Sequence, residues 1–538
     1  MTSPDAVASP DEAPDGAAAP SPPRVLRRWA VALCVAALLA EMATAMVTAA
    51  VQQTPTIDEP VYVGAAVSYQ REHSLRSNPE HPPLGKLIMG AGLAVERPRL
   101  DEGFTGTQEA AGRHVLYESG NDAGRVLLAA RLPMIVLTLL FGLVVFAFAA
   151  DLTGRVGGLV ALALYAFSPD VIAHGSLATL DVPASGFLLT SAWTVWRARE
   201  RPLPYLPLAA VALGAAVATK MSMLAAVPVL MALAACSRPS WGGRAGAALG
   251  MLAGTVAVVW ACYLAVDPRL RWTAPPGVPD IGGMRALLVD LMPFPRPYRD
   301  GMRVQFGFED STWDGFLLGH HYRGALWYYL PAALLVKTPL GMLALWAIGV
   351  GVLRRAALYV VLPVAVLLAV AMTGSRDLGV RYVIFVPMFL AVAAAACVTV
   401  PRLRWVTAVL VLFVAVSSLR TFPYYLPYSN EAFGGPSKTH LRLHDSNVDW
   451  GQDLGRLADR LRARYLDERV WLAYKGSGVP SSYGIRAGDP FRVPPGQVRG
   501  LLVVSDSWIA KADPRLTVLL RDSVPVDEVG HSITIFRR

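Results

Sequence analysis

Two carboxylates open a segment in which the residue types and their spacing could support chemistry. Asp58 and Glu59 are adjacent in the segment 56–62, directly before Pro60. This pattern is typical of a helix start, because proline suits the first turn and carboxylates favour the positive end of the helix dipole. A carboxylate that is held ionised in this way can also accept a proton as a general base. The sequence leaves both interpretations open.

A second motif, Asn-Pro-Glu-His-Pro-Pro-Leu-Gly-Lys at 78–86, places His81 and Lys86 in a proline-rich turn before an apolar stretch. A rigid turn that carries two basic side chains is a candidate anion site. Further polar residues stand near the ends of apolar runs, namely Asp181, Lys220, Arg381, His320 and His321. Each has a structural alternative as a helix cap, a side chain that extends to the membrane surface, or a satisfied buried residue.

The chain around these residues has the composition of a membrane protein. Of its 538 residues, 54% are hydrophobic and 17% are charged, and the mean hydropathy is +0.42. Soluble chains carry about 25% charged residues, so a soluble enzyme is excluded. Four cysteines without CxxC spacing argue against a disulfide scaffold and structural zinc, and no segment resembles a nucleic-acid-binding module.

Apolar runs long enough to be membrane spans alternate with short basic connections. They lie near 29–51, 131–150, 157–169, 182–196, 204–219, 221–236, 245–266, 326–352, 356–373, 382–400 and 405–419. At roughly 20 residues a span, they predict about 11 transmembrane helices. One basic cluster precedes the first run, near residues 24–28, and the others follow every second run, near residues 155, 197–201, 238–244, 354–355 and 402–404. By the positive-inside rule that side is cytoplasmic, so the amino terminus is predicted inside and the candidate site residues outside the plasma membrane.

This topology predicts three regions. Residues 1–23 form a disordered cytoplasmic tail, and residues 24–420 form a transmembrane domain with large outer loops at about 52–130 and 267–325. Residues 421–538 have ordinary soluble composition, with a helical stretch at 453–465 and strand-like runs at 470–474, 501–505 and 532–536. They predict a small extracytoplasmic α/β domain. A cleaved signal peptide at 24–51 is a weaker alternative, because its apolar stretch is too long.

The order of these motifs resembles the GT-C superfamily of lipid-phosphosugar-dependent glycosyltransferases, which includes protein O-mannosyltransferases and aminoarabinose transferases. The resemblance rests on the Asp-Glu pair, the His-Pro-Pro-Leu-Gly-Lys turn, the Asp181 turn, the Thr219-Lys220 segment, and the stretches at 320–331, 376–387 and 445–453. It implies transfer of a sugar from a polyprenyl phosphate to a hydroxyl, with inversion and no covalent intermediate. No motif fixes the subfamily.

The resemblance gives each candidate residue an expected role. Asp58, with Glu59 beside it, is expected to act as the base, and a leaving phosphate needs cationic donors. Phosphate binding is expected from His81, Lys86, Lys220 and Arg381, and substrate binding from Asp181, Tyr62, His320 and His321. No cofactor is required by this reaction, but the acidic motifs leave a divalent metal possible.

Two other classes of function compete with glycosyl transfer. A flippase or transporter of polyprenyl-linked sugars would need charge within the spans, where Glu41 is the conspicuous example. A non-catalytic accessory subunit would not need the Asp58–Glu59 pair. The expected partners are a polyprenyl-phosphate sugar, membrane lipids and an acceptor that is a protein, polysaccharide or lipid. The sequence identifies neither the sugar nor the acceptor.

Overall fold

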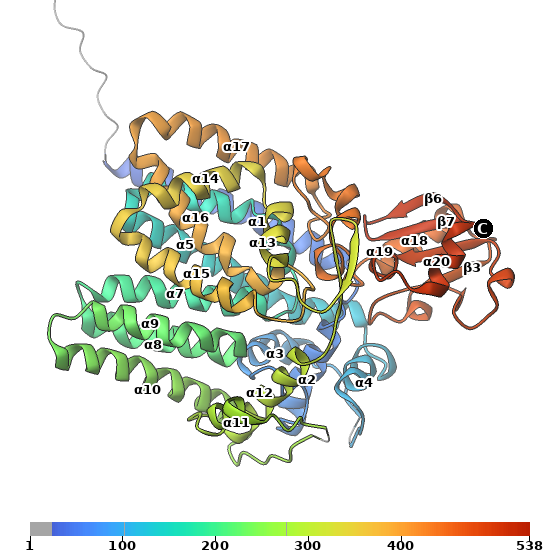
Figure 1. The fold of residues 1–538 in the computed structure, drawn as a ribbon, viewed down its shortest axis with the longest axis horizontal. Helices are drawn as coiled ribbons and strands as arrows, with labels where there is room; N and C mark the ends of the chain where they lie inside the picture. Colours follow the sequence, from blue (N-terminus) through green and yellow to red (C-terminus); the bar gives the residue numbers. More distant parts are fainter. Residues whose placement is uncertain (1–23, 102, 276) are drawn as a thin grey trace, which may run out of the picture.

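The computed structural model describes residues 24–538 except residues 102 and 276. The predicted disordered tail, 1–23, lies outside the described residues. Long helices form a bundle, and the carboxyl-terminal part of the chain builds a smaller α/β unit at one end of it (Figure 1). Several of the candidate site residues lie between the bundle and the α/β unit.

The apolar runs of the sequence fall largely in helices of the bundle. In chain order the helices are α1 (Arg24–Gln52), α5 (Ala123–Ala166), α7 (Asp181–Ala198), α8 (Pro202–Thr219), α9 (Ala226–Cys236), α10 (Trp241–Val266), α13 (Tyr329–Lys337), α14 (Leu340–Val352), α15 (Ala357–Ala371), α16 (Phe385–Ala394) and α17 (Arg404–Thr421). α5 contains two runs, because its helix breaks at Gly154, where φ is 82°. The second half folds back on the first, and the Tyr165 hydroxyl donates to the Thr138 carbonyl at 2.8 Å.

By length and composition alone, five of the described helices could cross a membrane, or six if the bent pair α13–α14 is one span. Three further apolar helices are shorter, at Met221–Cys236, Ala357–Ala371 and Phe385–Thr399. The helical, multi-pass character of the chain agrees with the sequence analysis. The number of about 11 spans stays a prediction.

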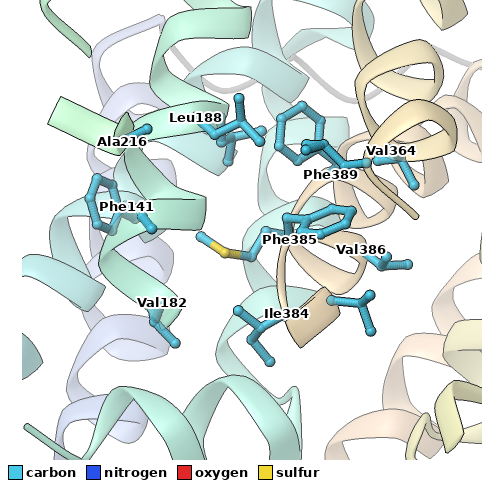
Figure 2. Close-up of a cluster of buried hydrophobic side chains, with 14 of the residues drawn as sticks. Phe141, Val182, Leu188, Ala216, Val364, Ile384, Phe385, Val386 and Phe389 are labelled. Atoms are coloured by element: carbon cyan, nitrogen blue, oxygen red, sulfur yellow. The ribbon is translucent and has the colours of Figure 1, made fainter. Parts of the chain in front are cut away.

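The bundle core is an interlocking layer of large and small side chains from α5, α7, α8, α15 and α16 (Figure 2). Phe141 packs directly on Gly186, where a Cβ atom would come within 2.1 Å of the phenyl ring. Helix packing in a membrane depends on such close contacts rather than on hydrophobic transfer. The core therefore fixes α7 against α5, and with it the position of Asp181 at the start of α7.

The α13–α14 pair bends by 118° at Pro339, which cannot continue the backbone hydrogen-bond ladder. Asn430 satisfies the carbonyls that the break exposes, because its side-chain amide donates to the Leu335 and Thr338 carbonyls at 2.7 and 2.8 Å. Broken helices are tolerated in membrane proteins where the freed backbone groups find such partners.

The loops at the site end of the bundle contain short elements. They are α2 (Glu59–Glu72), α3 (Leu84–Glu96), α4 (Gln108–Arg113), α6 (Pro169–Gly175), α11 (Gly283–Asp290), α12 (Arg296–Glu309) and the hairpin β1 (Asp314–Leu317) with β2 (His320–Arg323). α12 packs closely on the proline-rich turn, since a Cβ atom at Gly301 would meet the Pro79 carbonyl oxygen at 1.8 Å. The Gln305 amide also donates to the Glu80 carbonyl at 2.8 Å.

The carboxyl-terminal unit is a five-stranded mixed sheet in the order β4-β3-β5-β7-β6. Its elements are α18 (Leu454–Arg464), β3 (Val470–Ala473), β4 (Ala487–Gly488), β5 (Leu501–Ser505), α19 (Asp506–Ala510), α20 (Pro514–Arg521), β6 (Val524–Val529) and β7 (Ile533–Arg537). β3 pairs with β4 and β5 in parallel, and β7 pairs with β5 and β6 antiparallel. The helix and the three strands expected from the sequence correspond to α18, β3, β5 and β7.

Candidate active site

A cavity of about 940 Å³ lies between the helix ends and the α/β unit. Six of the candidate residues line it, although they are far apart in the sequence: Asp58, Tyr62, His81, Asp181, Lys220 and Arg381. The Arg381 Nη1 atom is 2.6 Å from Asp58 Oδ2 and 4.0 Å from Asp181 Oδ2. The Lys220 ammonium forms an ion pair with the other oxygen of Asp181. The structure therefore joins two carboxylates and two cations in one network.

The direction of the helices explains why these residues meet. α7 begins at Asp181 in the cavity and ends beside Arg197, and α8 begins after Arg201 and ends just before Lys220. At the opposite end of the bundle, Arg197 pairs with Asp151 at 3.3 Å. The cavity and the basic connections thus occupy opposite ends of the same helices. Arg381 enters from the 3-10 turn Val380–Val383, which precedes α16.

Asp58 is the residue before α2, but it does not cap that helix. Its backbone has α-helical angles and its side chain makes no capping hydrogen bond. The carboxylate instead points to Arg381 and lines the cavity. The interpretation of Asp58 as a helix cap therefore loses its main support. Its role as a general base stays a prediction.

Glu59, which the sequence paired with Asp58 as catalytic, faces the other way. Its side chain is completely buried and forms a two-point ion pair with Arg131, with N···O distances of 2.7 and 2.6 Å. Its oxygens also accept hydrogen bonds from the backbone of Thr56 and Ala178. Burial opposes its ionisation, but the Arg131 guanidinium and these hydrogen bonds hold the pKa of Glu59 below its usual range. Glu59 is a structural anchor, because all its contacts lie away from the cavity.

His81 lines the cavity, with its Nδ1 atom buried and without a partner among the described residues. Burial, reinforced by the charges of Lys86 and Lys220, holds the pKa of His81 well below its usual range. The imidazole is therefore neutral at physiological pH. A neutral imidazole suits a hydrogen bond rather than a charge contact, and phosphate binding by His81 stays a prediction.

Lys86 does not reach the cavity, contrary to the sequence prediction. Its Nζ atom is buried and donates to the Asn78 carbonyl, the Asn78 side chain and the His81 carbonyl at 3.0, 2.9 and 2.6 Å. Burial lowers the pKa of Lys86 to about 7. Because every donor of the ammonium is used within the turn, Lys86 shapes the loop that carries His81.

We expect Lys86→Met to lower the free energy of unfolding by about 1–3 kcal/mol, because three buried oxygen acceptors lose their donor. Thermal unfolding of the purified protein measures this change. Lys438→Met is the matched control, since Lys438 is exposed, lies outside the cavity and forms no ion pair among the described residues. Unchanged stability of Lys86→Met with weakened donor binding would instead support a role in phosphate binding.

The remaining predicted substrate residues separate into two groups. Tyr62, on the first turn of α2, lines the cavity. His320 and His321 lie on the exposed strand β2 and do not line it. His321 Nε2 is 3.8 Å from Asp314 on the paired strand. The substrate-binding role predicted for both histidines is therefore not supported by their position.

Several cavity residues escaped the sequence analysis. Glu309 on α12 pairs with Arg376 at 2.9 Å, next to the turn that carries Arg381. From the tail, Asp445 forms an ion pair with Lys475, and both line the cavity. Although burial opposes ionisation, the Lys475 charge holds the pKa of Asp445 below its usual range. The sequence analysis included the segment 445–453 in the family resemblance, but it assigned none of these residues to the site.

Two further features concern the competing predictions. Glu41 on α1 has one carboxylate oxygen that is buried and without a partner in the described part of the chain, but it does not line the cavity. Within residues 24–538, less 102 and 276, no three His, Cys, Asp or Glu side chains are close enough together to hold a metal ion.

Known proteins can now be compared with this fold and cavity. The family model described as dolichyl-phosphate-mannose-protein mannosyltransferase matches residues 123–263. Apo ArnT from Cupriavidus metallidurans is similar in structure, with a TM-score of 0.50 and 14% identity over 95% of this chain and 98% of that chain. The structure of ArnT from Cupriavidus metallidurans bound to undecaprenyl phosphate has a TM-score of 0.48 and 13% identity, over 95% of this chain and 98% of that chain. The S. cerevisiae protein O-mannosyltransferase Pmt1–Pmt2 complex bound to the sugar donor has a TM-score of 0.34 and 18% identity. This match covers 44% of this chain and 33% of that chain. Comparison with curated proteins finds no match.

These matches confirm the predicted resemblance to the GT-C glycosyltransferases. At 14% identity, the similarity to ArnT establishes the fold alone, which is that of a multi-pass helical membrane protein. The class of reaction that the family model indicates is glycosyl transfer.

Proposed function

We propose that this protein is a membrane glycosyltransferase that moves a sugar from a polyprenyl-phosphate donor to an acceptor hydroxyl. The observation that carries the proposal is the convergence of Asp58, Asp181, Lys220 and Arg381 in one cavity at one end of the apolar helices. The family model that matches 123–263 is named for a polyprenyl-phosphate mannose donor and supports the same class of substrate.

The cations of the cavity suit the leaving group. A polyprenyl phosphate gains negative charge as the sugar departs, and preorganised cations stabilise that charge in the transition state. Arg381 offers a planar donor set whose Nε atom has no partner among the described residues, and Lys220 offers a point charge. Asp181 contacts both cations and so keeps them together before the donor binds.

Asp58 is the carboxylate best placed to receive the acceptor proton. Its carboxylate lies on the cavity wall and is about a quarter exposed, whereas Asp181 is almost completely buried. In a single displacement, the acceptor oxygen forms the new bond to the anomeric carbon as the bond to phosphate breaks, and its proton passes to Asp58. The configuration of the sugar is therefore inverted.

An apolar strip of the cavity suits the lipid part of the donor. Leu224, Ala225, Val370 and Ala371 line it at the ends of neighbouring apolar helices. A polyprenyl chain in the bilayer could follow this strip while its phosphate lies at Lys220 and Arg381. The acceptor, whether protein, polysaccharide or lipid, would then approach from the side of the α/β unit, past Trp313 and Asp314.

The decisive experiment is to reconstitute the purified protein in liposomes and supply a panel of polyprenyl-phosphate sugars with hydroxyl acceptors. We expect transfer from at least one donor, with inverted configuration in the product. We expect transfer to continue with a chelator present, because Lys220 and Arg381 provide the charge for the phosphate. Transbilayer movement of the donor without transfer would favour the flippase alternative, and donor binding without either would favour an accessory subunit.

We further propose that the cavity faces outward from the plasma membrane, since the basic connections lie at the opposite helix ends. Exposed positions on the two sides allow a test in a variant without the four native cysteines. We expect an impermeant thiol reagent to label Ser481→Cys in intact cells and Ser240→Cys only after permeabilisation, because both positions are exposed. The reverse pattern would place the cavity on the cytoplasmic side.

A further inference from the structure

A short loop of the carboxyl-terminal region, residues 445–453, is buried although it is rich in polar residues. Nearly all its side chains have less than a tenth of their surface exposed, and Ser446 and Asn447 have none exposed. Burying polar groups is costly unless each finds a partner. We call this segment the tail loop, and its partners lie on both sides of the proposed active site.

On one side, the tail loop binds the chain that leads into Asp58. The Ile57 backbone N–H, one residue before Asp58, donates to the Trp450 carbonyl at 2.9 Å. The Thr54 N–H donates to the Gln452 carbonyl at 2.9 Å, and the Thr54 hydroxyl donates to the Gly451 carbonyl at 3.2 Å. The segment before α2 is thereby held in one position by the backbone of the tail loop.

On the other side, the tail loop binds the turn that carries Arg381. The Val380 backbone N–H donates to Asn447 Oδ1 at 3.0 Å, and the Ser446 hydroxyl donates to the Leu378 carbonyl at 2.8 Å. The Arg381 guanidinium lies over the Trp450 ring at 4.4 Å, within the range of a cation–π interaction. Arg381 is thus fixed through its backbone neighbour and through its own side chain.

The tail loop is itself held from behind. The Asn447 amide donates to the Tyr329 hydroxyl at 3.0 Å, and the Asn447 carbonyl accepts from the buried Lys337 ammonium at 2.9 Å. Ser507 of the α/β unit donates through its hydroxyl to the Asp449 carbonyl and through its N–H to the Asp449 side chain, at 2.9 and 3.1 Å. The loop is therefore anchored both to the bundle and to the α/β unit.

We propose that Asn447 and Trp450 are positioning residues, which hold Arg381 and Asp58 at the separation that sugar transfer requires. The proposal rests on the proposed function. It assigns the carboxyl-terminal region a part in assembling the active site, in addition to its own separate fold. Small displacements of a reacting group are sufficient to slow a reaction roughly 100-fold.

The test compares Asn447→Ala and Trp450→Leu with Asn430→Ala, assayed as folded, purified proteins in liposomes with the donor that the wild type uses. Asn430 is a matched control, because it is also a fully buried asparagine with three side-chain hydrogen bonds but supports the α13–α14 break instead. We expect turnover to fall roughly 10- to 100-fold in Asn447→Ala and Trp450→Leu, and much less in Asn430→Ala. Trp450→Phe, which keeps an aromatic face for Arg381, should recover most of the turnover.

A second measurement separates positioning from general destabilisation. Each variant is combined with Arg381→Lys, and both turnover and donor affinity are measured, since residues that act through one another give non-additive effects. We expect non-additivity with Asn447→Ala and Trp450→Leu, and additivity with Asn430→Ala. Additive effects in all the double variants, or an equal loss of turnover in Asn430→Ala, would overturn the positioning role of Asn447 and Trp450. Transfer by the wild type would still support the glycosyltransferase function in that case. Absence of transfer by the wild type would overturn both.

Discussion

Replacement of Asp58 by Asn should reduce sugar transfer by roughly 10²–10⁴-fold, the usual contribution of a positioned general base. The change keeps the shape of the side chain and removes only its ability to take up the acceptor proton. Little stability should be lost, because Asp58 makes no capping hydrogen bond and its ion pair with Arg381 is partly exposed. Turnover, donor binding and thermal unfolding should be measured on the same preparation.

The control for this prediction is Glu109→Gln, the same chemical change on an exposed carboxylate at the rim of the cavity. We expect near-normal turnover in that variant. Donor binding in Asp58→Asn should stay at or above the wild-type level, since Arg381 loses a competing partner. If Asp58→Asn turns over normally, Asp58 is not the base, and Asp181 becomes the next carboxylate to test.

The Glu59→Gln variant should lose much of its stability, whereas Asp58→Asn should lose turnover and keep its stability. Arg131 uses all five of its N–H donors, two on Glu59 and three on the carbonyls of Ala50, Gln53 and Thr54. Removing the negative charge leaves a buried guanidinium unpaired, which costs about 3–5 kcal/mol. Thermal unfolding in detergent should report this loss, and the added substitution Arg131→Gln should recover part of it.

The matched control is Glu96→Gln, which breaks a partly exposed ion pair with Arg125 and should cost less than about 1 kcal/mol. The two residues, Asp58 and Glu59, thus give separable results although they are neighbours in sequence. Wild-type stability of Glu59→Gln together with lost turnover would contradict the structural assignment and return Glu59 to the reaction.

Much of the site could be predicted from the sequence because its residues stand at the ends of apolar runs. Alternation of those runs with basic connections assigns Asp58, Asp181, Lys220 and Arg381 to one end of the bundle, whatever the helix packing. Hydrophobic periodicity and charge bias are local signals that need no tertiary information. The resemblance to GT-C enzymes, which the comparisons confirm, rests on the same residues.

Only the tertiary structure decided which way each side chain points within that end of the bundle, and which partner it binds. Successive residues at a helix start point to different sides, so Asp58 reaches Arg381 while Glu59 is buried against Arg131. Lys86 lies in the expected loop, but the oxygens that surround it come from the fold of the turn.

The tail loop shows most clearly the difference between what the sequence indicates and what only the tertiary structure decides. Its residues are visible in the sequence, but they lie more than 60 residues from Arg381 and almost 400 from Asp58. No local pattern encodes which distant backbone groups will satisfy a buried asparagine, because that choice depends on how the bundle and the α/β unit pack together. The sequence by itself therefore determined which residues gather at one end of the membrane helices. The tertiary structure decided which of them face the cavity, because burial and pairing are properties of the packed chain.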